Sequence, residues 1–165
     1  MSETRSDWLE QQVRAYEQRL LRYCCRFTRA EVAREIVQES FVRLWNQFDK
    51  VRGREREWLF HVARNLAVDH LRREKSVRLV DEEGVTLPAA EATISFREDL
   101  SQLQDCLARL RPAEREVVRL KFQEGMSYQE ISSVTGHSVS YVGVLLHQAV
   151  EKMRQWMAST GGTLR

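Results

Sequence analysis

Apolar residues recur at every third or fourth position through most of this chain, which is the spacing of one face of an α-helix. The pattern predicts a helix from Trp8 to Phe27, a second from about Ala30 to Gln47 and a third from about Glu55 to Glu74. Three helices that bury these stripes against one another predict a first domain over residues 1–76. The stripes comprise Leu9, Val13, Tyr16, Leu20 and Cys24, then Val37, Phe41, Leu44 and Phe48, then Leu59, Val62, Ala63 and Leu66.

The helical pattern is interrupted over residues 77–98, which contain a glycine and a proline. Acidic side chains outnumber basic ones seven to three over residues 77–110. We therefore predict a flexible acidic linker at 77–98. The periodicity resumes at Leu100 and predicts a helix that stops at Arg111, because the residue before a proline disfavours the helical conformation. Pro112 suits the first position of the following helix.

Residues 99–165 are predicted to form a second domain that ends in a helix-turn-helix. Ser127 and Glu130 have the spacing of a capping box at the start of a short helix, and Gly136 favours its end. A longer helix follows from Ser140 to about Met157, capped by Ser138 or Ser140. The expected core between the two helices comprises Ile131, Val134, Val139, Val142, Leu146, Ala149 and Met153.

This order of a short helix, a glycine turn and a long helix is typical of DNA-binding proteins, although an ordinary helical hairpin would give the same pattern. Alternating apolar and polar residues, the pattern of a strand, are absent over any useful length. The predicted fold class is all-α, with two small helical domains joined by a flexible acidic linker, the C-terminal one a helix-turn-helix.

The formal net charge is only +2, so overall charge does not predict a nucleic-acid partner. Its distribution is uneven, because residues 51–76 carry seven basic and four acidic side chains. Cations in this block can neutralise phosphates, and an asparagine or arginine can hydrogen-bond to base edges. A solvated basic face would look similar. Trp58 is interpreted as a core anchor rather than a platform for an unpaired base, and Trp45 and Phe48 are also expected in the core.

Catalytic and metal-binding motifs are not found in the sequence. It contains no glycine-rich phosphate loop and no HExxH, and its four histidines lack metal-ligand spacing. We therefore expect no enzyme activity, no metal and no cofactor. Three cysteines without CxxC spacing suggest packing residues in a reducing cytoplasm. No apolar run approaches the ~18 residues of a membrane helix, so membrane insertion is not expected.

Three segments of the chain resemble bacterial extracytoplasmic-function (ECF) RNA polymerase sigma factors. They are "AREIVQESFVRLWNQFD", "EWLFHVARNLAVDHLRR" and "LRPAEREVVRLKFQEGMSYQEISSVTGHSVSYVGVLLHQAVEKMR", and they occur in the family's order. They look like the core-polymerase-binding helix, the minus-ten segment and the minus-thirty-five segment. The resemblance implies a sigma region 2-like domain at 1–76, a linker at 77–98 and a sigma region 4-like domain at 99–165.

The resemblance implies a role for the polar residues of the first domain. The face of the second helix opposite its apolar stripe would dock on core polymerase through Arg34, Glu35, Gln38, Glu39 and Arg43. Glu35 replaces an aspartate that is common in the family, which leaves the charge in place. Duplex and single-stranded DNA at the minus-ten element would be contacted by Lys50, Arg52 and Arg54 in a loop at about 48–56 and by Arg64, Asn65, Arg72 and Arg73 on the third helix.

The last helix departs from the family pattern. Relatives usually supply cations at the positions that are here Gly143, Val144 and Leu145, and often at Gln148, but this sequence reads "YVGVLLHQ". Without about three phosphate contacts, the salt dependence of binding should be flatter by about 2 to 3 units. Gly143 would also let the helix backbone come close to DNA. The remaining candidates for the minus-thirty-five contact are Ser140, Tyr141, Val144, His147 and Gln148.

The function expected from the resemblance is that of a sigma factor, which directs core RNA polymerase to specific promoters and assists DNA melting. Its partners would be core RNA polymerase, promoter DNA and, as for many relatives, an anti-sigma factor. An alternative is a sigma-like regulatory protein that binds polymerase or another protein without promoter-specific initiation, using exposed Val144, Leu145 and Leu146. An enzyme of nucleic-acid metabolism is a third and weaker alternative.

Overall fold

The computed structural model describes residues 3–75 and 94–159, and these residues form helices joined by short turns, without strands. The chain divides into two compact units between Leu87 and Pro88, a point within the predicted linker. Residues 76–93 lie outside the described part of the chain, and so does most of that linker. None of the described helices combines the length and apolar character that a membrane span requires.

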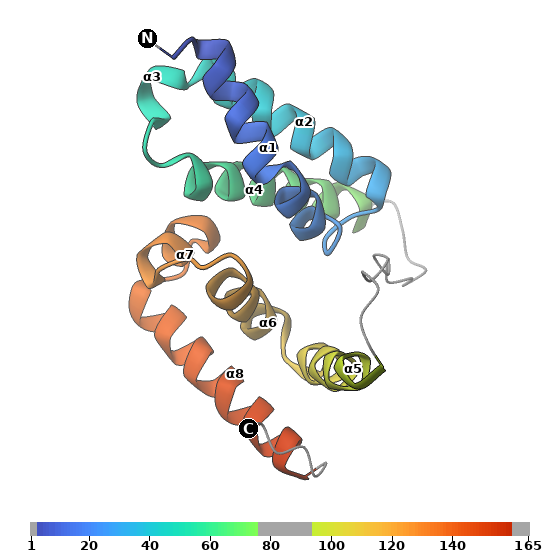
Figure 1. Cartoon of the computed structure of the whole chain (residues 1–165). Coiled ribbons are helices and arrows are strands. Elements are labelled where there is room, and N and C mark those ends of the chain that lie inside the picture. The colour runs from blue at the N-terminus through green and yellow to red at the C-terminus, as the bar shows by residue number, and fades with distance from the viewer. Residues whose placement is uncertain (1–2, 76–93, 160–165) are drawn as a thin grey trace. The chain divides into compact units, whose positions relative to one another are not determined.

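The first unit is built from α1 (Arg5–Cys24), α2 (Ala30–Asn46), the single turn α3 (Phe48–Val51) and α4 (Glu55–Lys75). The helices α1, α2 and α4 pack against one another in all three pairings, as Figure 1 shows. The predicted helices are therefore confirmed to within three residues at each end. Their shared core contains the fully buried Leu20, Leu44, Leu59, Phe60, Ala63 and Ala67.

The short helix α3 replaces part of the loop that was predicted at about 48–56. Its formation follows from packing, because Val51 is buried and the Phe48 ring meets Trp8 edge-on with 4.8 Å between ring centroids. Gly53 then turns the chain with a φ of 89°, a conformation that favours glycine. Its N–H donates to Glu55 Oε1 at 2.9 Å, and the Trp8 indole donates to the same oxygen at 3.3 Å. These contacts fix the turn that leads into α4.

Trp45 was predicted to lie in the core, and this prediction is wrong. On α2, 36% of the residue remains exposed. The Arg5 guanidinium lies over its ring at 4.4 Å from the centroid. A cation on an aromatic face lets the ring stay at the surface with one side covered. Phe48 is only partly buried and is contacted by Arg5 and Arg52 in the same way.

The second unit contains α5 (Ile94–Arg109), α6 (Pro112–Val118), the π-helical turn η1 (Arg119–Gln123), α7 (Tyr128–Thr135) and α8 (Val139–Ser159). The long helix α8 contacts α5, α6 and α7 and thus organises the unit (Figure 1). The fully buried apolar side chains of this unit include Val117, Leu120, Met126, Ile131, Val142, Leu145 and Ala149.

The helix ends of the second unit follow the sequence signals closely. Pro112 begins α6, and Ser127 forms the predicted capping box with Glu130, whose N–H donates to Ser127 Oγ at 3.1 Å. Gly136 ends α7 with a φ of 78°. Ser138 is the cap of α8, since its hydroxyl accepts a bond from the Tyr141 N–H at 3.1 Å. The predicted helix-turn-helix is therefore present.

Three details of the second unit differ from prediction. Helix α5 begins at Ile94, inside the range predicted as linker, because neither glycine nor proline interrupts the chain between Pro88 and Pro112. It also ends at Arg109, two residues early. Val139 was expected in the core but is 43% exposed at the first position of α8.

Candidate nucleic-acid and polymerase interfaces

The outer face of α2 carries all five residues predicted to bind polymerase, and each is exposed. They lie opposite the buried Val37, Phe41 and Leu44. Glu39 and Arg43 form an ion pair one helical turn apart, 2.8 Å between Oε1 and Nε, with about half of each side chain exposed. Such a pair adds little to helix stability, so these charges remain available to a partner.

Two apolar residues of this α2 face were missed from the sequence. Val42 is 56% exposed and lies seven positions after Glu35, which places it on the same side of the helix. Trp45 follows one turn later. The sequence could have indicated that Val42 is exposed, because this residue falls outside the apolar stripe of the helix. An exposed apolar centre surrounded by polar residues is typical of protein-binding surfaces.

The cations predicted to contact minus-ten DNA fall in two groups within the first unit. Lys50, Arg52 and Arg54 are exposed around α3 and the Gly53 turn. Arg52 is partly neutralised by an ion pair with Glu3, 3.3 Å between Nη2 and Oε2. Trp58, which was interpreted as a core anchor, is half-buried at the start of α4.

The second group lies on α4, where Asn65, Arg72 and Arg73 are exposed and Arg64 is half-buried. Asn65 and Arg72 are seven residues apart and share one side of the helix, with the exposed acidic Asp69 between them. The Asn65 amide nitrogen is hydrogen-bonded to His61 Nε2 at 3.1 Å, which orients the amide. The face therefore combines cations with an oriented hydrogen-bonding group.

The five residues predicted to contact the minus-thirty-five element lie together on one exposed face of α8. Tyr141 and Val144 are 42% and 48% exposed, and Tyr141 also meets the His137 ring edge-on. The remaining residues of the face are Ser140, His147 and Gln148, all exposed.

The opposite side of α8 is its core face. Leu145 and Leu146 are buried at 0% and 4% exposure, contrary to the apolar outer surface that the regulatory alternative requires. Three consecutive apolar residues cannot all face outward on a helix, and packing against α6 and α7 turns the two leucines inward. Only Val144 of that trio remains at the surface.

Gly143 does not leave an open space for DNA, contrary to prediction. A Cβ atom added there would lie 3.5 Å from the Tyr128 ring, which is ordinary contact distance. Tyr128 from α7 therefore already occupies the side of α8 next to Gly143.

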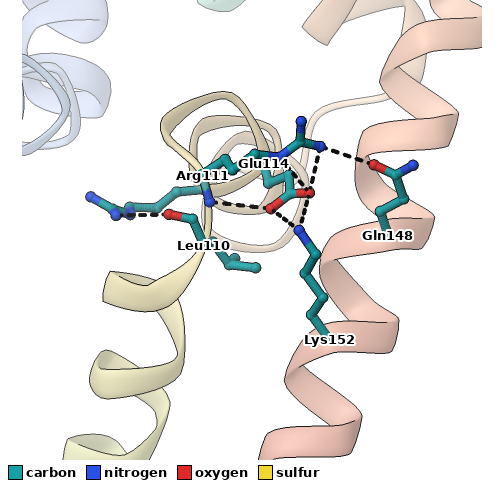
Figure 2. A network of polar contacts seen from close by, with 6 residues as sticks. Leu110, Arg111, Glu114, Gln148 and Lys152 are labelled. Carbon is teal, nitrogen blue, oxygen red and sulfur yellow. Dashed lines mark hydrogen bonds and ion pairs between the residues drawn. The ribbon is translucent and has the colours of Figure 1, made fainter.

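A buried carboxylate connects α6 to α8 (Figure 2). Glu114 is fully buried and accepts bonds from Arg111 Nη2 at 2.8 Å and from Lys152 Nζ at 2.8 Å. Burial raises the pKa of Glu114, but the hydrogen bonds from Arg111 and Lys152 outweigh it and lower the pKa to about 2. Lys152, the first cation along α8, is thus paired with Glu114, although 40% of its side chain is exposed.

Arg111 also reaches the exposed face of α8. Its Nη2 donates to Gln148 Oε1 at 3.0 Å. Since a guanidinium can only donate, the Gln148 oxygen must be the acceptor. The amide nitrogen of Gln148 is therefore the group left to contact a ligand.

Comparison with known families and proteins covers both units. The Sigma-70 region 2 family matches residues 12–77 and the Sigma-70 region 4 family matches residues 100–153. The ECF RNA polymerase sigma factor SigL of Mycobacterium tuberculosis is 31% identical over 152 residues, 87% of this chain and 85% of SigL. The chain belongs to the ECF sigma factor family.

A further sigma factor and two solved structures are also similar to this chain. The RNA polymerase sigma factor YlaC of Bacillus subtilis is 28% identical over 163 residues, 93% of this chain and 94% of YlaC. The sigma factor RpoE of Bartonella quintana, solved with the anti-sigma factor NepR, has the same fold, with a TM-score of 0.70 at 18% identity over 90% of this chain and 96% of that one. CnrH, solved with the cytosolic domain of CnrY, gives 0.59 at 24% identity, over 92% and 88%.

As an ECF sigma factor, the chain is a promoter-specificity subunit for transcription initiation by RNA polymerase. Its helices α1 to α4 make up most of region 2, and α5 to α8 contain region 4. Sigma factors are DNA-recognition subunits rather than catalysts. Among the described residues, no group of three or more histidine, cysteine or acidic side chains is arranged to hold a metal ion.

Proposed function

We propose that this sigma factor divides its contacts among three surfaces. The outer face of α2 docks on core polymerase, the basic residues around α3 and α4 engage the minus-ten element, and the exposed face of α8 contacts the minus-thirty-five element. The observation that carries the proposal is the exposure of the candidate side chains on the same helices whose other faces form the core. The domain boundaries at 76 and 98 belong to this proposal.

The proposed minus-ten surface contributes binding free energy that offsets the cost of DNA melting. Unstacking a base costs a few kcal/mol, which the holoenzyme must offset by holding the extruded base and the single strand. Lys50 and Arg54 are exposed on either side of the Gly53 turn, where cations can steer a phosphate backbone. Asn65 and Arg72 supply hydrogen-bond donors to the adjoining duplex.

The surface of α8 is suited to weak but directional contacts. Backbone N–H groups at its first turn favour a phosphate, Val144 can touch a thymine methyl group, and His147 and Gln148 can hydrogen-bond to DNA. We expect this helix to add modest specificity while core polymerase supplies most of the affinity.

The cellular location that we propose follows from the RNA polymerase partner. RNA polymerase transcribes in the cytoplasm, so we place this protein there, and no step of its task requires it to act as an enzyme. RpoE was solved with an anti-sigma factor, and we propose a partner of that class for this chain as well.

Transcription from a promoter library tests the proposed function. Purified protein is added to core polymerase with the library, and the transcripts are sequenced. Start sites that share upstream elements are expected, with elements centred near minus ten and minus thirty-five. Polymerase binding without specific initiation would instead support the sigma-like regulatory protein, although the burial of Leu145 and Leu146 removes most of the surface proposed for it.

Charge reversal on α4 tests the minus-ten surface. Arg72→Glu combined with Arg73→Glu is expected to abolish open-complex formation, because four units of charge change beside the DNA phosphates. Polymerase binding should persist, since α2 is unaltered. Arg14→Glu with Arg29→Glu, two exposed positions outside all three surfaces, is the matched control and should still form open complexes. Unchanged transcription by the Arg72 and Arg73 variant would refute the assignment.

A further inference from the structure

The exposed face of α8 lacks cations of its own. Helix α8 contains neither lysine nor arginine before Lys152, and Lys152 is bonded to both oxygens of Glu114, at 2.8 and 3.1 Å. A helix that contacts DNA usually gains much of its affinity from phosphates. A cation at this face must therefore come from a neighbouring element of the second unit.

Arg111 meets that requirement. It precedes α6, and 59% of its side chain is exposed. Its guanidinium reaches across to α8, where Nη2 donates to Gln148 Oε1 at 3.0 Å. Gln148 is one of the five residues of the exposed α8 face. The hydrogen bond to Glu114 and the charge of that carboxylate raise the pKa of Arg111.

The charge of Arg111 is not cancelled by its acidic partner. Glu114 carries one negative charge and is bonded to two cations, Arg111 and Lys152. Because burial and two strong partners keep Glu114 ionised, the three side chains together keep one net positive charge. Arg111 is the more exposed of the two cations, with 59% of its side chain exposed against 40% for Lys152, so more of this surplus is presented at the Arg111 end. Figure 2 shows both cations bonded to the Glu114 carboxylate.

The hydrogen bonds of Arg111 use two of its three guanidinium nitrogens and leave the third for a ligand. Nε and Nη2 bond to Glu114 at 3.1 and 2.8 Å, and Nη2 bonds to Gln148. Nη1 has no hydrogen-bond partner among the described residues, and in Figure 2 this nitrogen points away from the carboxylate. A guanidinium fixed in this way loses little further freedom when Nη1 binds a ligand.

We propose that Arg111 binds a phosphate of the DNA backbone next to the minus-thirty-five contact and supplies the cation that α8 lacks. A phosphate fits better than a guanine edge, because the usual recognition of guanine needs two donors from one guanidinium edge and Nη2 is already occupied. The inference rests on the proposed contact of α8 with the minus-thirty-five element.

The test measures how salt affects DNA binding by the reconstituted holoenzyme. A promoter found by transcript sequencing is used as two duplexes, one complete and one that ends downstream of the minus-thirty-five element. Arg111→Gln removes the charge while Glu114 keeps Lys152. The expected slope of log affinity against log salt on the complete duplex is shallower by about 0.9, so wild type loses about 3.5-fold more affinity than the variant between 50 and 200 mM salt.

Arg154→Gln is the matched control, because it removes one exposed cation from α8 outside the proposed site. Its slope should equal that of wild type. On the shortened duplex, Arg111→Gln and wild type should have equal slopes. If Arg111→Gln loses helicity by circular dichroism, Arg111→Met, which keeps the apolar stem, takes its place with the same expectation.

The outcomes separate this inference from the function on which it rests. Equal slopes for the Arg111 variant and wild type on the complete duplex would overturn the role of Arg111 alone. Equal wild-type affinity for the two duplexes would show that the second unit does not contact the minus-thirty-five element, which would overturn both.

Discussion

Glu114 combines full burial with a charge, which is uncommon unless the charge is paired. Arg111 and Lys152 provide the pairing from two directions and join α6 to α8 at the base of the exposed α8 face. Removing the carboxylate would leave two partly exposed cations that water can solvate. The loss should therefore be moderate rather than complete.

We expect Glu114→Gln to lower the free energy of unfolding of the second unit by about 1–3 kcal/mol, because it replaces the carboxylate acceptor of two cations with a neutral amide oxygen. Hydrogen exchange of peptides from α6 and α8 measures this. Glu151→Gln is the control, because Glu151 makes an exposed pair with Arg154. It should change the free energy by less than about 0.5 kcal/mol. Equal exchange in both variants would contradict the role of Glu114.

The same residue predicts a pH dependence. Its pKa is about 2 in the folded protein, below the ordinary value of 4.5. As pH falls below 4.5 the unfolded chain takes up a proton before the folded one does, so the stabilisation by Glu114 is present above pH 4.5 and is lost as pH approaches 2. Within this window wild type should lose more stability than Glu114→Gln does.

At the scale of the helix, the two faces of α2 have different roles. Its buried side holds the first unit together, while its outer side has exposed charges around Val42 and Trp45. Changes to the outer side should therefore affect binding without affecting folding.

Glu39→Lys tests this separation. It breaks the pair with Arg43, which should cost the fold about 0.5 kcal/mol or less. Affinity for core polymerase is expected to fall by about tenfold or more, because a reversed charge faces the partner. Binding of labelled protein to polymerase measures the effect. Glu10→Lys, which breaks the equivalent exposed pair with Arg14 on α1, should bind as wild type does. Equal losses in both variants would argue against α2 as the docking face.

The exposed face of α8 is tested by Tyr141→Ala and His147→Ala. Alanine favours helix, so neither change should unfold the second unit. Each is expected to lower initiation several-fold on promoters with a minus-thirty-five element. Gln155→Ala, exposed further along α8, is the control. Rates equal to wild type on every promoter would contradict a DNA contact by this face.

Helix positions were predictable because local signals agree with packing. The capping box at Ser127, the proline at 112 and the αL glycine at 136 each act over a few residues, so the sequence alone locates them. Within the run Val144 to Leu146, the burial of Leu146 was correctly expected in the core, but that of Leu145 was not. Consecutive apolar residues have no helical phase, and contacts with α6 and α7 decide that Leu145 is buried.

Contacts between residues far apart in the chain could not be predicted from the sequence either. Glu114 and Lys152 are 38 residues apart and Arg5 reaches Trp45 across 40, and no periodicity links such pairs. The exposed candidates for polymerase and DNA came from the family resemblance combined with helical phase. Arg111 was missed because it lies outside the helix that the resemblance identifies as the DNA contact.

At the scale of the whole molecule, the two units differ in the charge of their proposed DNA-contacting surfaces. Eight lysines and arginines of the first unit lie in or around α3 and α4, whereas the exposed α8 face of the second unit depends on residues that are mostly neutral. Salt should therefore affect the two DNA contacts unequally.

Adding charge to α8 tests this difference. Val144→Arg with His147→Arg should steepen the salt dependence of holoenzyme binding to a complete promoter by about 1.8 units, because two phosphate contacts are added. Gln155→Arg with Ala158→Arg, both exposed beyond the proposed contact, should change it less. Equal slopes for these two variants would mean that the exposed α8 face does not lie against DNA.

The neutral face of α8 also affects where the protein spends its time before it meets polymerase. A chromosome offers roughly 10⁶ to 10⁹ non-specific sites, which retain proteins mainly through their attraction to phosphate. A region 4 with little such attraction dissociates quickly from random sequence. The second unit then adds little to the retention of the free protein on bulk DNA, and that retention depends mainly on the cations of the first unit.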